Sequence, residues 1–424
     1  MGVARGWVVV AAAHIALFVA FGVTYSFAAF FAALQTEFGA ARADVSLVFA
    51  ISGFLYFLIG AFAGPVADRF GPRRVTVFGL VMLALGLAAA ARAPSLSVLY
   101  VTYSVGVGVG VGCMYVPVVG AVQPWFTRRR SVASGVAVAG IGLGTLVVPL
   151  CAAWLIESFG WRNALDVMAL GALVFGGIAV ALVDNDPTRH GLGPDGTIAV
   201  APMGDERGSQ ASPREASLRH AGPRHAPPGV LLRDALRMPK FWIKYAAIVC
   251  CSLGMFIPFV HLVPYARDVG QSERAGVLLM GLIGVGSLVG RFGLAGLGDR
   301  MPRAALHVSV YLGMAAMLAV WLGSSSVFAL GFFALVFGAF YGGFVALQPA
   351  LVMDYYGARN VAGIIGLLYT GAGVGNLLGP WLAGLAFDWQ RSYNLPILVS
   401  IGFMLVAAAL AQRLRRESTY ESLH

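Results

Sequence analysis

Charged residues are scarce in this chain of 424 residues. Asp, Glu, Lys and Arg together make up 11% of the sequence, whereas hydrophobic residues make up 59%. Ordinary soluble domains carry about 25% charged residues. With a mean hydropathy of +0.81, the composition excludes an ordinary soluble globular fold and predicts a protein that crosses a lipid bilayer several times.

Cysteine is almost absent, and its occurrences form no metal or redox motif. Cys113, Cys151, Cys250 and Cys251 fall within apolar stretches and show no C-x-x-C spacing. Packing as a small apolar side chain is the usual role of such residues. The sequence also lacks a metal-spaced cluster of His and Cys and a nucleophile constellation, so we expect no cofactor, no metal and no enzymatic activity.

Apolar runs long enough to cross a bilayer recur along the chain. A helix needs about 20 apolar residues to cross a hydrocarbon core of ~30 Å, whereas transmembrane β-strands are alternating segments of about 10 residues. We therefore predict an all-α integral membrane protein with twelve transmembrane helices. They cover residues 7–32, 45–67, 75–92, 97–119, 132–155, 163–183, 241–265, 275–297, 305–322, 327–348, 361–385 and 391–412.

The distribution of basic residues predicts the orientation in the membrane. Cytoplasmic loops carry an excess of Lys and Arg, and most basic residues fall in tails and loops that lie inside if the N-terminus is cytoplasmic. We expect a multi-pass protein of the inner (cytoplasmic) membrane with both termini cytoplasmic. The net charge of +10 then needs no nucleic-acid partner. The loops assigned outside contain Arg42, Arg92, Arg162, Arg267, Arg274 and Arg391.

A polar segment divides the chain into two halves. Residues 184–238 are rich in Pro, Gly, Arg and His and cannot bury a core, so we expect a disordered cytoplasmic linker. It separates six helices at 1–183 from six more at 239–412, and a cytoplasmic tail follows at 413–424.

The two halves repeat. When the second half is aligned on the first so that Asp299-Arg300 matches Asp68-Arg69, several glycines and a proline of one half also fall on those of the other. We call this constant separation in sequence the repeat offset. Since each half has an even number of spans, the copies share one orientation and are related by an axis along the membrane normal.

Two motifs resemble the major facilitator superfamily. The loop GPVADRFGPRR (64–74) resembles its G-x-x-x-D-R-x-G-R-R element, and AGLGDRMPR (295–303) resembles the weaker second copy. The resemblance implies a substrate site near the midplane between the halves. Charge-assisted contacts at these helix ends can hold the cytoplasmic side closed and release it on switching. The gating residues so implied are Asp68, Arg69, Arg73, Asp299 and Arg300.

A third motif narrows the resemblance. The stretch PWFTRRRSVASGVAVAGIGLG (124–144), with RGWVVV at the start of the first span, is similar to elements of the monocarboxylate transporter family and its prokaryotic lactate-type relatives, which are related to the oxalate/formate group. This resemblance implies a secondary transporter that moves a small organic anion by alternating access.

Arg291 is a permanent charge in the apolar stretch GVGSLVGRFGLAG (284–296). It lies about eight residues before the helix end, roughly 12 Å into the membrane, and its own span contains no acid. A charge at this depth costs at least about 2.5–3.5 kcal/mol and usually marks a substrate or ion path. Its planar fork suits a carboxylate, so an organic anion would supply the counter-charge. The alternative is an arginine paired with an acid or carbonyls of a neighbouring helix.

The family resemblance agrees with this interpretation and also limits it. Transporters of this family carry a substrate-binding arginine in the eighth span, at the place of Arg291. Ser287 stands where animal members have an aspartate used in proton coupling, and the first-span lysine of those members is missing, with Tyr25 the nearest polar candidate. The route of the proton is therefore not indicated by the sequence.

Further polar residues are candidates for the same site. His261 lies near the outer end of span seven between two prolines, as a substrate contact or proton relay, or as a hydrogen-bonded core histidine. Tyr115, Tyr341, Tyr369 and Asn376 come from spans four, ten and eleven. They either line a cavity around Arg291 or satisfy their polar groups against neighbouring backbone.

The leading hypothesis is a proton-coupled transporter of a small monocarboxylate such as lactate or pyruvate. Oxalate-type exchangers use a second basic residue in span eleven for a dianion, and residues 361–385 contain none. Exchange of oxalate or formate is one alternative. Export of drugs or other amphiphiles is a second, since GNLLGPWLAG resembles an antiporter element, although in span eleven rather than five.

Overall fold

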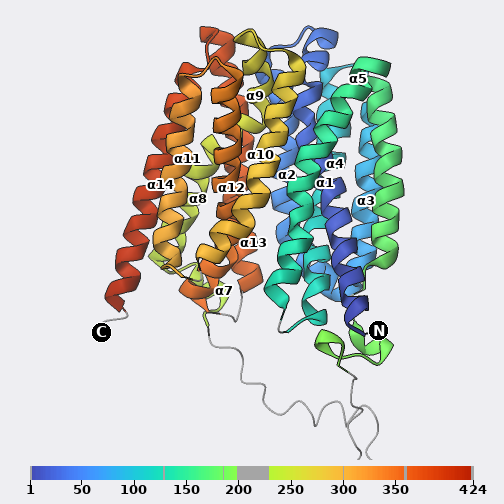
Figure 1. Ribbon diagram of the computed structural model, residues 1–424, viewed down its shortest axis with the longest axis vertical. Helices are drawn as coiled ribbons and strands as arrows, with labels where there is room; N and C mark the ends of the chain where they lie inside the picture. Colours follow the sequence, from blue (N-terminus) through green and yellow to red (C-terminus); the bar gives the residue numbers. More distant parts are fainter. Residues whose placement is uncertain are drawn as a thin grey trace, which may run out of the picture.

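The computed structural model describes residues 2–127, 129–184, 186–197, 229–298, 300–357 and 361–421, and this part of the chain is helical (Figure 1). The N-terminal half contains α1 (Gly2–Phe38), α2 (Arg42–Phe70), α3 (Pro72–Ala90), α4 (Leu96–Val122) and α5 (Arg130–Leu182). The C-terminal half contains α8 (Pro239–Met255), α9 (Ile257–Asp268), α10 (Glu273–Leu297), α11 (Arg303–Leu322), α12 (Val327–Tyr356), α13 (Val361–Gln390) and α14 (Asn394–Glu421). Several helices extend beyond the apolar runs that predict them.

Helix α5 comprises two spans that meet at Gly160. This residue has φ 79° and ψ 160°, outside the helical region, so the helix breaks there. Arg391, which follows Gly160 by the repeat offset, also has a positive φ, 55°, and separates α13 from α14. Ten described helical segments are long and apolar enough to cross a membrane, with α5 counted once and α8 and α9 counted together. The second span of α5 and the glycine-rich α13 complete the expected twelve.

The repeat is also visible at two helix ends. Gly39 ends α1 with φ 57°, and its equivalent in the second half, Gly270, follows α9 with φ 84°. Residues other than glycine rarely adopt this left-handed conformation. The equal offsets of these special backbone positions indicate that both halves fold to the same plan.

The halves meet along two equivalent helix pairs. A Cβ added to Gly142 of α5 would lie 3.2 Å from Leu288 Cβ of α10, and one added to Gly373 of α13 would lie 3.2 Å from Phe57 Cβ of α2. Gly373 and Leu288 follow Gly142 and Phe57 by the repeat offset, so the two contacts have the same register. Small residues let helices approach closely in a bilayer.

The two faces of the molecule are distinguished by the chain ends. Both ends lie on the lower face in Figure 1, which we call the termini face, and which also carries the α2–α3 connection at Gly71. The upper face, which we call the opposite face, carries the α1–α2, α9–α10 and α13–α14 connections and the break within α5.

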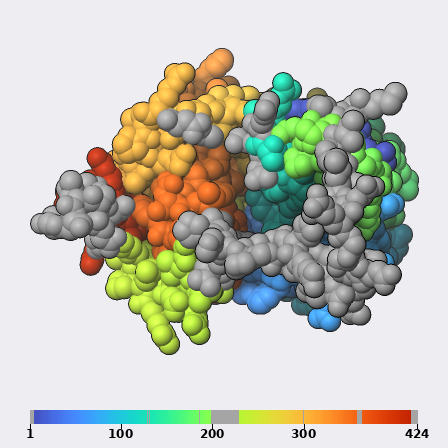
Figure 2. Space-filling model, turned by 90° about the horizontal axis from the view of Figure 1, so that it is seen from below, coloured from blue at the N-terminus to red at the C-terminus, as the bar shows by residue number. Residues whose placement is uncertain are grey.

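The start of the segment between the halves is folded. Residues 186–197 form two short turns, Pro187–His190 and Pro194–Gly196, and lie under the N-terminal half (green in Figure 2). The Asp195 carboxylate accepts a hydrogen bond from the backbone N–H of Thr127 (3.1 Å). Residues 186–197 of the expected linker are thus folded, whereas residues 198–228 lie outside the described residues.

A small polar contact also holds this segment. Trp125 Nε1–H donates to the carbonyl of Asp184 (2.7 Å), and the His190 ring lies 2.7 Å from the Asp184 carboxylate. Burial tends to raise the pKa of Asp184, but hydrogen bonds from His190 and from the backbone N–H of Asp186 hold it below the usual value. Toward the end of the segment, α7 is a single turn, Leu232–Ala235.

Candidate substrate site

Close packing of α10 against α12 fixes the position of Arg291. A Cβ at Gly290 would lie 1.8 Å from the Ala339 carbonyl oxygen, and a Cβ at Gly342 would lie 2.1 Å from the Ser287 carbonyl oxygen. Only glycine permits such an approach of two backbones. The helix segment that carries Ser287 and Arg291 is thus held directly against α12.

The Arg291 guanidinium is buried and largely unpaired. The side chain is 6% exposed, and its Nε–H donates to Ser287 Oγ at 3.3 Å. Both terminal nitrogens are buried without a hydrogen-bond partner in the part of the chain that the structure describes. A guanidinium has five N–H donors and cannot lose its charge. The free edge of the fork is therefore suited to an anion.

Buried positive charges outnumber buried negative ones. Among the described residues, Arg42, Lys244 and Arg291 are buried, and no Asp or Glu is. Arg42 pairs with Asp268, whereas no ion pair between described residues involves the other two. The alternative of an arginine neutralised by an acid of a neighbouring helix thus finds no support in the described structure.

Four buried tyrosines from four helices lie within electrostatic range of Arg291. The charge of Arg291 acts on Tyr25 of α1, Tyr115 of α4, Tyr341 of α12 and Tyr369 of α13. Tyr115, Tyr341 and Tyr369 are candidates for the substrate site in the sequence, and Tyr25 is the polar residue nearest to the missing lysine of the first span. Hydroxyl groups of this kind can bind the oxygens of a small hydroxy or keto acid.

Tyr25 links the two halves at this level. Its hydroxyl shares a hydrogen bond of 2.8 Å with the Tyr341 hydroxyl, and its ring stacks on Phe259 with centroids 4.6 Å apart. Phe259 also contacts the Tyr341 ring at 5.0 Å. These contacts join α1 of the first half to α9 and α12 of the second.

Tyr56 of α2 belongs to the same cluster and is not among the sequence candidates. Its ring lies 5.9 Å from Phe21 and 4.2 Å from Phe57, and it interacts with Tyr115, Tyr341 and Tyr369. Alignment of the two halves indicates that Tyr56 belongs to the site, because Ser287 follows Tyr56 by the repeat offset. The two residues occupy equivalent places in the two halves.

His261 has its partners away from Arg291. Its Nε2 lies 2.8 Å from the Pro380 carbonyl oxygen, to which it donates, and 3.2 Å from Ser46 Oγ, while Nδ1 lies 3.0 Å from the Tyr393 hydroxyl. Both ring nitrogens are occupied, and the residue is fully buried. The geometry is that of a hydrogen-bonded histidine in the contact between the halves rather than of a substrate contact.

Asn376 lies in the α2–α13 contact. Its Nδ2 donates to the Ala50 carbonyl at 3.4 Å, and the amide fills the space over Gly53. Its Oδ1 is buried without a partner among the described residues. The structure places this amide between the halves and shows no contact of it with Arg291.

An ion-pair network joins the halves at the opposite face. Arg42, at the start of α2, binds Asp268 of α9 through two nitrogens at 2.6 and 2.7 Å and donates to the Tyr393 hydroxyl at 2.7 Å. The guanidinium also lies over the Phe387 ring, 3.7 Å from its centroid. Since Tyr393 in turn contacts His261, we call Arg42, Asp268, Tyr393 and His261 the opposite-face lock.

Two further contacts strengthen the closure at equivalent positions. The Asp388 carboxylate accepts from the backbone N–H of Arg42 (3.0 Å) and Ala43 (2.9 Å). Glu157 of α5 accepts two hydrogen bonds from Arg274 of α10, at 2.8 and 2.9 Å. Asp388 and Arg274 follow Glu157 and Ala43 by the repeat offset. Both interfaces between the halves are therefore fastened at this face.

The predicted gating residues at the termini face are not fastened in this way. Asp68, Arg69, Arg73 and Arg300 are exposed, and within the described structure they make no ion pair. Asp299 lies outside the described residues. The conformation is thus closed at the opposite face, with charged groups at the termini face available for contacts in another conformation.

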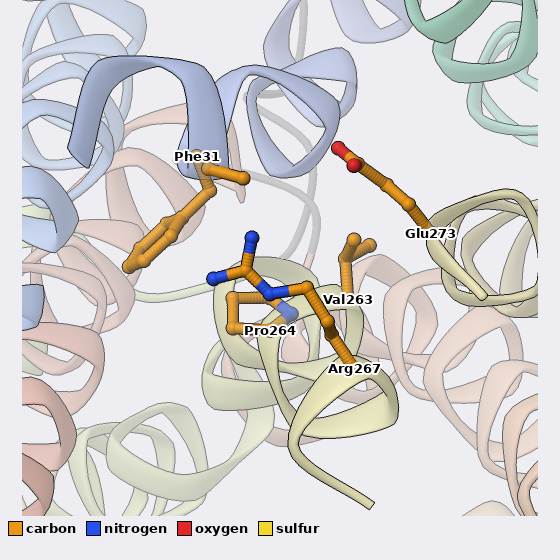
Figure 3. Close-up of a pocket in the computed structure, with 6 residues that line it drawn as sticks. Phe31, Val263, Pro264, Arg267 and Glu273 are labelled. Carbon is orange, nitrogen blue, oxygen red and sulfur yellow. The ribbon is translucent and has the colours of Figure 1, made fainter. Parts of the chain in front are cut away.

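A shallow pocket beside the lock is separate from the Arg291 site. It is lined by Phe31 and Ala32 of α1, Val263, Pro264 and Arg267 of α9, and Glu273 of α10. Figure 3 shows the Arg267 guanidinium between Phe31 and Glu273, with Pro264 beneath it. Because the pocket lies at the opposite face, it does not contribute to the cluster around Arg291.

Comparison with known proteins places the chain in a family. The family model described as Major Facilitator Superfamily matches residues 13–336 and 297–422. The chain belongs to this superfamily, and the all-α, two-half fold predicted from the sequence is confirmed. The crystal structure of a D-xylose–proton symporter has the same fold, with a TM-score of 0.72 over 96% of this chain and 97% of that one, at 14% identity. As a member of the Major Facilitator Superfamily, the protein is a secondary transporter and not an enzyme.

Relatives with full-length similarity carry a more specific name. Monocarboxylate transporter 12-B of Danio rerio is 26% identical over 96% of this chain and 86% of its own length. Monocarboxylate transporter 13 of Bos taurus is 26% identical over 96% of this chain and 88% of its own length. The chain is thus a distant relative of monocarboxylate transporters.

Proposed function

We propose that this carrier moves a small monocarboxylate, such as lactate or pyruvate, together with a proton. The observation that carries the proposal is Arg291, a buried guanidinium whose terminal nitrogens lack partners among the described residues. A carboxylate binds such a fork through two charge-assisted hydrogen bonds. The full-length similarity to proteins named monocarboxylate transporters supports the same class of substrate.

The charge around the site favours a singly charged anion. Lys244, the other buried basic residue without an ion-pair partner in the described structure, interacts with His307 and Tyr355 rather than with the tyrosines of the Arg291 cluster. One guanidinium neutralises one carboxylate, so oxalate would bring a second negative charge that Arg291 cannot offset. Exchange of a dianion is accordingly the weaker candidate.

Alternating access is supported by the unequal state of the two faces. With both termini in the cytoplasm of an inner-membrane protein, the opposite-face lock becomes the outer gate and the exposed residues Asp68, Arg69, Arg73 and Arg300 belong to the inner gate. In the outward-facing state, we expect an anion to be bound, the ion pairs at the opposite face to be broken and ion pairs to form at the termini face.

Uptake into proteoliposomes tests the proposal. We expect labelled L-lactate to accumulate above its equilibrium level when the outside is more acidic than the inside, and a protonophore to reduce the accumulation to the equilibrium level. Absence of both uptake and lactate self-exchange would contradict the substrate class. Uptake that ignores the imposed gradient would contradict the coupling to protons.

A further inference from the structure

A second buried basic side chain lies within the C-terminal half. Lys244 of α8 is 2% exposed, and in the described structure it has neither an ion pair nor a hydrogen bond. Its nearest aromatic contact is loose, with Nζ 5.8 Å from the centroid of the Tyr355 ring. An ammonium buried without a counter-ion is costly, so the side chain needs a physical reason to be there.

Its surroundings contain unused hydrogen-bonding groups. His307 of α11 lies within electrostatic reach of Lys244, and its Nε2 is 3.0 Å from the Tyr311 hydroxyl. His307 Nδ1 is buried without a partner among described residues, as are both polar atoms of the Gln348 side chain, which adjoins Tyr311. We call Lys244, His307, Tyr311 and Gln348 the Lys244 cluster.

Helix α12 connects this cluster with the Arg291 site. Tyr341, Gln348 and Tyr355 recur at a constant spacing of two helical turns, so they share one face of the helix. Tyr341 faces Arg291, whereas Tyr355 faces Lys244. A displacement of α12 would therefore act on both sites.

No described acid neutralises the cluster. Asp354 of α12 is bound to Arg303 at 3.1 Å and is exposed at the termini face. Asp388 of α13 accepts hydrogen bonds from the backbone N–H groups of Arg42 and Ala43 at the opposite face. The other described titratable groups on the surrounding helices carry no negative charge at neutral pH. They are Lys240, Tyr245, Cys250 and Cys251 on α8, Arg303, His307 and Tyr311 on α11, Tyr341, Tyr355 and Tyr356 on α12, Tyr369 on α13 and the exposed Arg413, Arg415 and Arg416 on α14.

We propose that Lys244 is the proton-binding site of this carrier, an inference that rests on the proposed function. The lone pair of Nζ takes the proton from one side of the membrane and returns it to the other. An anion on Arg291 and a proton on Lys244 add charges of opposite sign, so the total charge of the protein interior is the same in the empty and the fully loaded carrier. Either ligand alone would change that charge in a medium of low dielectric constant.

The test separates proton-driven accumulation from exchange. In proteoliposomes containing the full chain, Lys244→Met and Lys244→Arg are compared with wild type for labelled lactate counterflow at equal pH and for accumulation under an acidic outside pH. Arg237→Gln is the matched control, because it removes an exposed cation just before α8. We expect both Lys244 variants to keep counterflow within about threefold of wild type and to lose accumulation above the equilibrium level.

The arginine variant distinguishes proton binding from a structural need for positive charge. If Lys244→Arg restored accumulation while Lys244→Met did not, a fixed charge would suffice and the proposal would be wrong. Accumulation retained by Lys244→Met, or counterflow lost in both variants with Arg237→Gln intact, would equally overturn it. Absence of lactate counterflow in the wild type would instead overturn the proposed function and this inference with it.

Discussion

Arg291→Ala is expected to abolish binding and uptake of monocarboxylates. The substitution removes the two terminal nitrogens of the guanidinium, which have no partner in the described structure. Hydrogen bonds to charged groups contribute about 1.5–3 kcal/mol each, so loss of a bidentate contact should weaken binding by roughly 100-fold or more. The measurement is the dissociation constant of lactate for the purified carrier, accompanied by the initial rate of uptake in proteoliposomes.

Two further variants make this test specific. Arg291→Lys keeps the charge but loses the planar fork, so we expect an affinity between those of wild type and Arg291→Ala. Arg233→Ala removes an exposed arginine of α7 and should bind lactate as the wild type does. If Arg291→Ala bound lactate within about threefold of wild type, the arginine would not be the anion site.

Arg42→Ala is expected to open the opposite face. It leaves the Asp268 carboxylate and the Tyr393 hydroxyl without their main donor. Because hydrogen bonds between charged groups contribute about 1.5–3 kcal/mol, the conformational equilibrium should shift by roughly 10- to 100-fold. Spin labels at Ser97→Cys and Ser325→Cys, exposed on this face in different halves, would report a longer distance in a background without the native cysteines.

The ion pair itself is tested by exchange of the charges. Arg42→Asp combined with Asp268→Arg should return much of the distance distribution to that of the wild type. Arg92→Ala is the control, because Arg92 lies on the same face but pairs with Asp166 of its own half. A distribution that Arg42→Ala leaves unchanged would show that the lock does not hold the halves together.

The arrangement of helices could be predicted because the bilayer imposes it. Every backbone group in lipid must be bonded within a helix, so apolar runs report spans directly, and the constant offset between matching motifs reports the two-half plan. The two spans predicted at 132–155 and 163–183 are both present in α5, which breaks between them at Gly160.

Arg291 could be predicted for a similar reason. A charged residue with no acid in its own span must find a partner on another helix or in a ligand. The distance in sequence from Arg291 to the end of its helix indicates how deep in the membrane it lies. Whether a tyrosine lies near Arg291 depends on which face of its helix packs toward the centre of the molecule. The sequence identifies Tyr115, Tyr341 and Tyr369 as candidates. Tyr56 is recognised only when the two halves are aligned, because it is then equivalent to Ser287.

The partners of His261 could not be read from its own span. Ser46, Pro380 and Tyr393 lie 215, 119 and 132 residues away in sequence, on three different helices or at their ends. Periodicity fixes the depth of a residue but not the packing between helices of different halves. For the same reason the lock formed by Arg42 and Asp268, 226 residues apart, was not expected.

Competition between lactate and lactamide tests the central claim most directly. The two molecules have nearly the same shape, but lactamide carries an uncharged amide in place of the carboxylate. If Arg291 binds a single carboxylate, unlabelled lactate will compete with labelled lactate in counterflow, and lactamide will not compete at a hundredfold higher concentration. Equal competition by lactamide would show that the negative charge is not recognised, and would contradict the assignment of Arg291 as the anion site.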